Sequence, residues 1–206
     1  MESILEFILN LVGLMVGTTC GIITYNGFNK IGSPSLLRLA IAFFSIGVGF
    51  MIMLLKNIDT QIQENEIEQV IQIAGVSFQT VGYFFIAFSH IIKSFFAIKK
   101  YFSIVLPIFL ITVSNIENII RSVSFILLIY GSIETILSYL EKKTRRVILI
   151  ALGLLSLAFG EFLSWYQLIF PESIFYNTAI ILKIIGLILL FLPIAKIRFS
   201  FNKSLS

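Results

Sequence analysis

Long apolar segments, separated by short charged or turn-forming stretches, constrain this chain more than any other feature. A helix needs about 20 mostly apolar residues to cross a hydrocarbon core roughly 30 Å thick. Cutting the sequence where charge interrupts the apolar runs predicts seven spans, approximately residues 4–26, 36–55, 70–92, 101–120, 122–140, 147–168 and 174–195. Pro107 interrupts the fourth, whose apolar part is short. We therefore expect residues 1–206 to form a single all-α transmembrane domain, a polytopic bundle of seven helices.

Composition excludes the other broad classes. The 206 residues are 58% hydrophobic and 13% charged, whereas about 25% of residues are charged in soluble domains. The single cysteine excludes a disulfide scaffold and a cysteine-based metal site. The first segment lacks the basic start of a signal peptide and is too long for one, so we expect it to be retained.

The distribution of basic residues predicts the orientation of the spans, because lysine and arginine collect in short cytoplasmic loops. With the N-terminus outside, alternate assignment of the loops gives the inner side Lys30, Arg38, Lys93, Lys99, Lys100, Lys142, Lys143, Arg145, Arg146, Lys196, Arg198 and Lys203. The outer side receives Lys56 and Arg121, and acidic residues such as Glu6 and Glu117. We expect an outside N-terminus, a cytoplasmic C-terminus and a location in the plasma membrane.

The basic loops also bear on partners. Anionic lipid of the inner leaflet attracts lysine and arginine near the membrane, so the net charge of +4 requires no nucleic acid. The short loops leave no room for a binding domain. We expect contacts with lipid or with partner subunits at Lys99, Lys100, Lys142, Lys143, Arg145 and Arg146.

Two halves of the chain share a faint similarity. A shift of 111 residues superposes the second and sixth spans and pairs Ala40 with Ala151, Ser45 with Ser156 and Gly49 with Gly160. A shift of 104 residues superposes the third and seventh spans and pairs Gln79 with Lys183 and Gly82 with Gly186. Both halves begin outside, so the pattern favours a parallel 3+1+3 repeat with the fourth span as linker. Chance similarity between apolar helices is the alternative.

Small residues recur at helical spacing in two spans. Gly13, Gly17 and Gly21 are four residues apart in the first span, and Ser156, Gly160 and Ser164 form a similar row in the sixth. Such faces let helix backbones approach closely in a membrane. We expect them to pack inside the bundle, with a dimer face as the alternative.

Three ionisable residues, Glu134, Glu161 and Lys183, stand out within the predicted spans, where a charge costs on the order of 3 kcal/mol near the bilayer centre. Glu161 and Lys183 lie at similar depth on consecutive helices, at about 1.5 Å per residue, so we expect them to face each other. They form either a structural ion pair or the lining of a polar cavity for a substrate or proton. Glu134 lies close enough to the inner interface to reach water.

The third span has one polar face. Its members, spaced 7, 4 and 7 residues apart, are Gln72, Gln79, Tyr83 and His90. This row either converges on the same interior site as the ion pair or makes hydrogen bonds between helices.

Catalytic and cofactor signals are lacking in the sequence. None of the hydrolase, zincin, P-loop or dinucleotide-binding motifs occurs, and no ligand cluster suggests a metal. We expect no enzyme and no cofactor. Seven spans with a lysine midway along the last resemble microbial rhodopsins, but Gln72 and Gln79 stand where that resemblance implies an acidic counterion, which disfavours retinal on Lys183.

Two further resemblances concern architecture. The 3+1+3 plan resembles SWEET and PQ-loop transporters, although their Pro-Gln dipeptide is absent. Residues 27–50 (GFNKIGSPSLLRLAIAFFSIGVGF) and 79–91 (QTVGYFFIAFSHI) resemble small archaeal multi-pass membrane proteins of unknown function. This likeness covers the first half of the chain and implies no activity.

Two functions follow from these patterns. The first is a non-enzymatic seven-helix sensor or an accessory subunit of a membrane complex. The second is a small-solute or ion-coupled transporter whose polar core contains Gln79, Glu134, Glu161 and Lys183. A cavity that reaches these residues would favour transport, and a dry core would favour the first function.

Overall fold

The computed structural model describes residues 2–58, 65–91, 116–143, 145–167, 170 and 173–203. These residues form six helices, and their all-α character agrees with the sequence. The helices are α1 (Glu2–Ile31), α2 (Pro34–Ile58), α3 (Asn65–Ile91), α5 (Ile116–Lys142), α6 (Arg145–Gln167) and α7 (Ser173–Lys203).

Each of these helices is long and apolar enough to cross a membrane, with mean hydropathies from 1.5 to 2.2 over its span. Large apolar side chains such as Met51, Phe84 and Phe159 are exposed on the outside of the bundle, as contact with lipid requires. The multi-pass helical character of the chain is therefore supported. The predicted seventh crossing and the predicted orientation stay predictions.

The predicted division between the fourth and fifth spans is wrong. Residues 101–115 of the predicted fourth span lie outside the described residues, and α5 begins at Ile116 and continues without a break through Arg121. The sequence predicts a loop at Arg121, because charge interrupts the apolar run there. Inside a bundle, however, Glu117 and Arg121 can remain helical because they neutralise each other one turn apart.

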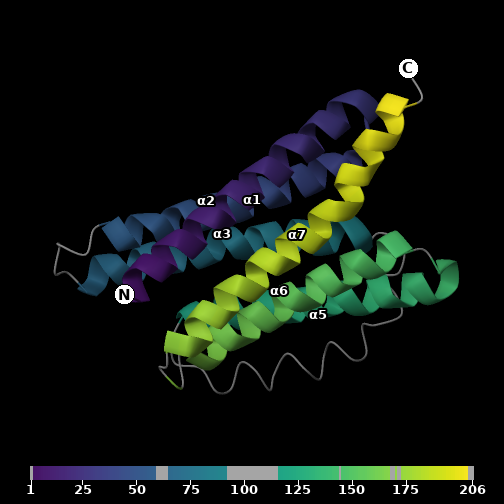
Figure 1. Ribbon diagram of the computed structural model, residues 1–206. Helices are drawn as coiled ribbons and strands as arrows, with labels where there is room; N and C mark the ends of the chain where they lie inside the picture. The colour runs from purple at the N-terminus through teal and green to yellow at the C-terminus, as the bar shows by residue number, and fades with distance from the viewer. Residues whose placement is uncertain are drawn as a thin grey trace.

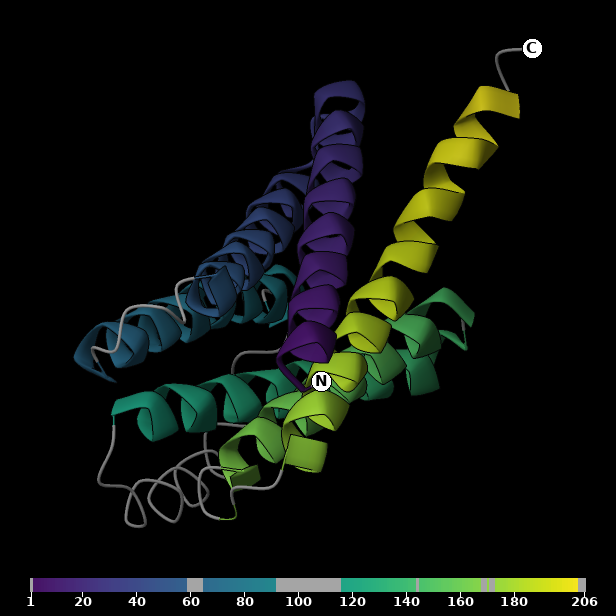
Figure 2. The same ribbon diagram turned by 60° about the vertical axis from the view of Figure 1, so that its left-hand side comes forward.

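The helices form two three-helix units. Helix α2 packs extensively against α1 and α3, and α6 packs extensively against α5 and α7. The units meet through two smaller contacts, α3 with α5 and α1 with α7. Figure 1 shows α1–α3 in purple to teal and α5–α7 in green to yellow. In Figure 2, α1 and α7 lie close near the N-terminal label and diverge toward their C-terminal ends.

Small residues bring the helices within each unit together. The glycines of α1 lie against α2: a Cβ on Gly17 would lie 3.0 Å from the Cα of Gly47, and one on Gly13 would lie 2.8 Å from the Phe50 ring. These glycines therefore lie inside the bundle, at the contact between α1 and α2.

The α2–α3 and α6–α7 contacts are built alike. Ser45 donates a hydrogen bond to the Phe78 carbonyl, and Ser156 donates one to the Leu182 carbonyl, both at 2.7 Å. A Cβ on Gly82 would lie 2.7 Å from the Ala42 carbonyl oxygen. The corresponding distance from Gly186 to the Gly153 carbonyl oxygen is 2.8 Å. Both pairs of helices thus approach at backbone contact distance.

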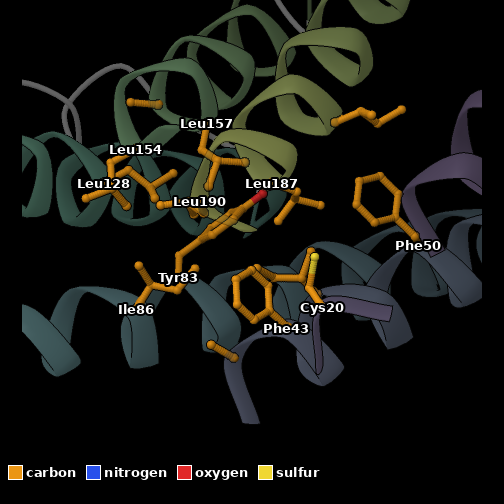
Figure 3. Close-up of a cluster of buried hydrophobic side chains, with 14 of the residues drawn as sticks. Cys20, Phe43, Phe50, Tyr83, Ile86, Leu128, Leu154, Leu157, Leu187 and Leu190 are labelled. Carbon is orange, nitrogen blue, oxygen red and sulfur yellow. The ribbon is translucent and has the colours of Figure 1, made fainter. Parts of the chain in front are cut away.

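Both units contribute to one buried apolar core. Figure 3 shows Tyr83 of α3 reaching toward the leucines of α5, α6 and α7, while Cys20, Phe43 and Phe50 contribute from α1 and α2. Tyr83 and Phe43 are fully buried. The core therefore spans the boundary between the units.

We expect Gly17→Ala to lower the free energy of unfolding in detergent by about 1–3 kcal/mol, because the added Cβ would crowd the α2 backbone. Gly27→Ala is the matched control, since a Cβ there lies 3.6 Å from a flexible Leu36 methyl group. Unfolding monitored by circular dichroism compares the two variants. Equal stability of both would contradict the close approach of α1 and α2.

Candidate functional site

A chain of alternating charges is buried between the helices. Lys183 Nζ lies 2.7 Å from Glu161 Oε1, and Arg121 Nη1 lies 3.4 Å from Glu161 Oε2. Arg121 Nη2 lies 2.7 Å from Glu117 Oε1. None of the four residues exposes more than 4% of its surface. We call Glu117, Arg121, Glu161 and Lys183 the charge cluster.

The helices position these charges through spacing and small neighbours. Glu117 and Arg121 are one turn apart on α5, which places them on the same face. A Cβ on Gly160 would lie 2.7 Å from Lys183 Cγ, so this glycine makes room for the lysine stem beside Glu161. Each of these charges needs a counter-ion for the fold to be stable, since an isolated buried charge is strongly destabilising.

The predicted contact between Glu161 and Lys183 is present, and its functional role stays a prediction. The contributions of Glu117 and Arg121 were missed, because both had been placed outside the membrane. One signal could have found them. Glu117 and Arg121 are spaced i, i+4 and are followed by the apolar run of α5, as expected for a charged face that turns inward.

The polar face of α3 reaches the charge cluster. Gln72 Nε2 donates to Glu117 Oε1 at 2.8 Å, and Lys183 Nζ lies 3.5 Å from Gln79 Oε1. Tyr83 is fully buried and lies within electrostatic reach of Glu161. The side chain of His90 lies outside the described residues.

Glu134 does not join the charge cluster. It lies 13 residues beyond Arg121 on α5, about 20 Å along the helix axis, and its neighbour is Tyr130. The two residues are half-buried. Of the residues predicted for the polar core, Glu134 therefore lies apart from the charge cluster.

Helix α1 contributes polar residues that the sequence reading had not placed in a site. The Tyr176 hydroxyl of α7 donates to Glu6 Oε1 at 2.7 Å. Asn10 exposes only 1% of its surface, and its Nδ2 has no hydrogen-bond partner within the part of the chain that the structure describes. Helix α1 therefore also contributes to the polar interior, through Glu6 and Asn10.

A small cavity lies where these residues meet. Its volume is about 10 Å³, close to the space that one buried water needs. It is lined by Asn10, Phe50, Met53, Gln79, Arg121, Ser164, Tyr176, Ile180 and Lys183. Both three-helix units contribute to the lining, so the cavity lies at their interface.

The expected basic contact residues are only partly described. Lys143 and Arg145 are exposed at the turn between α5 and α6. Lys99 and Lys100 lie outside the described residues, as do the side chains of Lys142 and Arg146. Among the described residues, no group of three histidine, cysteine or acidic side chains could hold a metal ion.

Comparison with protein-family models, with curated proteins and with solved structures finds no match. The similarity of residues 27–50 and 79–91 to archaeal multi-pass proteins stays a prediction.

We expect Lys183→Met and Glu161→Gln each to lower the free energy of unfolding by about 3–5 kcal/mol, because each leaves the charge cluster with an uncompensated charge. The double variant retains the neutral Glu117–Arg121 pair and should be more stable than either single variant. Chemical unfolding in detergent measures the coupling. Additive losses in the double variant would contradict mutual compensation.

Proposed function

We propose that this protein is a non-enzymatic carrier that moves a small polar solute or ion across the membrane in which it is embedded. One observation carries the proposal: the charge cluster borders a cavity at the contact between two three-helix units. Transporter sites typically lie near the bilayer midplane at the interface between structural repeats. Gln79 and Lys183, which face each other here, lie near the middle of their spans.

The proposal includes a parallel internal repeat of the 3+1+3 type, with seven spans. The paired positions from the sequence support it, because they make equivalent contacts. Ser45 and Ser156 bond to carbonyls of Phe78 and Leu182, which are themselves 104 residues apart. A Cβ on Gly49 would meet Gln79 Cγ at 2.6 Å, and one on Gly160 would meet Lys183 Cγ at 2.7 Å.

Equivalent hydrogen bonds in α1 and α5, the first helix of each unit, also support the repeat. The 111-residue shift relates Thr24 to Thr135, two buried hydroxyls that each bond to the carbonyl four residues earlier. The same shift relates Glu6 to Glu117. Glu6 accepts from Tyr176 and Glu117 accepts from Gln72, and these two donors are related by the 104-residue shift.

These last contacts cross between the units in both directions. The α1–α7 contact thus corresponds to the α5–α3 contact, as a two-fold rotation exchanging the units would require. The cavity has equivalent pairs in its lining, Asn10 with Arg121 and Gln79 with Lys183. A site on the rotation axis is contacted by both units at once, and rocking of one unit against the other would change access to it.

The proposed orientation, with the N-terminus outside, places the N-terminal end of α5, and with it Glu117 and Arg121, toward the outer face of the plasma membrane. The support for the orientation is the distribution of lysine and arginine.

A second candidate is an accessory or sensory subunit with a purely structural charge cluster. Full compensation of the four charges and the small cavity favour it. The exposed Lys143 and Arg145 would then contact a partner subunit.

Accessibility of the interface separates these functions. We expect Gln79→Cys, in a Cys20→Ala background, to react with a membrane-impermeant methanethiosulfonate from both faces of the membrane, assayed in right-side-out and inverted vesicles. A carrier exposes this position alternately, whereas a dry structural core exposes it to neither side. Val81→Cys is the matched control, because Val81 lies at similar depth but on the exposed apolar surface. Lack of reaction at position 79 from either side would favour the subunit.

A further inference from the structure

The cavity presents hydrogen-bond donors and positive charge. Arg121 and Lys183 bring two cations, and Asn10 brings a buried Nδ2 without a partner among the described residues. Gln79 adds a second amide, and Ser164 adds a hydroxyl. None of the described residues that line the cavity is a carboxylate. This lining suits an anion, since donors and cations stabilise negative charge.

The size of the cavity limits the anion. A volume of about 10 Å³ holds about one water-sized species. Among anions a halide ion comes near this limit, whereas phosphate or an organic carboxylate is much larger and does not fit without separation of the helices.

Charge balance requires a second ion. The charge cluster sums to zero, with Glu117 and Glu161 negative and Arg121 and Lys183 positive. An anion alone would leave a net negative charge in the membrane interior, which is costly. A proton bound with the anion restores neutrality.

Glu161 is the carboxylate that can exchange roles with the anion. It is fully buried and faces Lys183 of α7, Arg121 of α5 and Tyr83 of α3. The other carboxylates nearby keep partners of their own: Glu117 lies 2.7 Å from Arg121 Nη2 and accepts from Gln72, and Glu6 accepts from Tyr176. The residues of α2 that line the cavity, Phe50 and Met53, are apolar.

We infer that the cavity binds a small monovalent inorganic anion together with one proton, and that Glu161 carries the proton. Without the anion, the Glu161 carboxylate is the counter-ion of Lys183 and Arg121. With the anion bound, these cations face the anion, and Glu161 becomes a neutral carboxylic acid. One proton and one anion enter from the same side and leave together. The inference rests on the proposed carrier function and names its substrate class.

Anion binding can be tested without transport. The thermal stability of the purified full-length chain is titrated with sodium chloride, with sodium gluconate as the control for ionic strength, between pH 5.5 and pH 8. Because one proton binds with one anion, the apparent chloride affinity should fall by up to tenfold per pH unit over this range. An equal response to chloride and gluconate would overturn the inference. Chloride binding that is independent of pH would overturn the coupling to a proton.

Glu161→Gln mimics the protonated carboxyl. We expect it to bind chloride at least as tightly as the wild type does at pH 5.5, with no pH dependence, and to require chloride for stability. The matched control is Glu134→Gln, a carboxylate outside the charge cluster, which should retain the pH dependence of the wild type. Retention of that dependence in Glu161→Gln would contradict the role of Glu161.

Asn10→Leu keeps the inference testable if Glu161→Gln does not fold. It removes one donor from the cavity without changing any charge, and we expect chloride affinity to fall about tenfold or more. Unchanged affinity would overturn the assignment of the cavity as the anion site.

Proton coupling is tested in proteoliposomes. We expect an inward chloride gradient to acidify the lumen, reported by an enclosed pH-sensitive dye, for the wild type and Glu134→Gln but not for Glu161→Gln. Chloride uptake without acidification would overturn the coupling. Thiol reactivity of Gln79→Cys from both faces, combined with no response to chloride, would retain the carrier and reject the anion as its substrate.

Discussion

Compensation of buried charge is the constraint on which this structure depends. Glu161 is fully buried, and two cations from different helices approach its two oxygens. Each of those cations is held by a further interaction, Arg121 by Glu117 and Lys183 by Gln79. Removing any member would leave a buried charge without its counter-ion. The geometry of α3, α5, α6 and α7 must therefore satisfy all of these contacts together.

Close packing of small residues makes this compensation geometrically attainable. In a membrane, helices associate through backbone approach and hydrogen bonds, because lipid is as apolar as the helix surfaces. Gly160 admits the Lys183 stem, and Gly17 and Gly47 bring α1 and α2 together. The contacts of the polar interior thus require that the apolar helices pack closely, and the buried charges are tolerated only because this packing brings them together.

The interface between the three-helix units concentrates the polar chemistry. The charge cluster belongs to the α5–α7 unit, and Gln72 and Gln79 of α3 contact it from the other unit. The Glu6–Tyr176 contact also joins the two units, and the cavity lies between them. Electrostatic contacts depend steeply on distance when little water screens them. A small movement at this interface would therefore change the energies of the Gln72–Glu117, Gln79–Lys183 and Glu6–Tyr176 contacts together.

The sequence by itself determined the helical class of the described residues, their suitability for a membrane, and the depth match between Glu161 and Lys183. Each of these depends on composition or on rise per residue, which are local properties. The sequence analysis placed Glu117 and Arg121 outside the membrane, because charged residues at the end of an apolar segment predict a loop. Only knowledge of their ion-pair partners would have placed them in the interior. Only the tertiary structure decided that Arg121 joins Glu161, that Glu134 stays apart, and that Asn10 reaches the cavity. Those contacts join residues far apart in the chain, so they depend on how the helices cross, and helical periodicity does not encode the crossing.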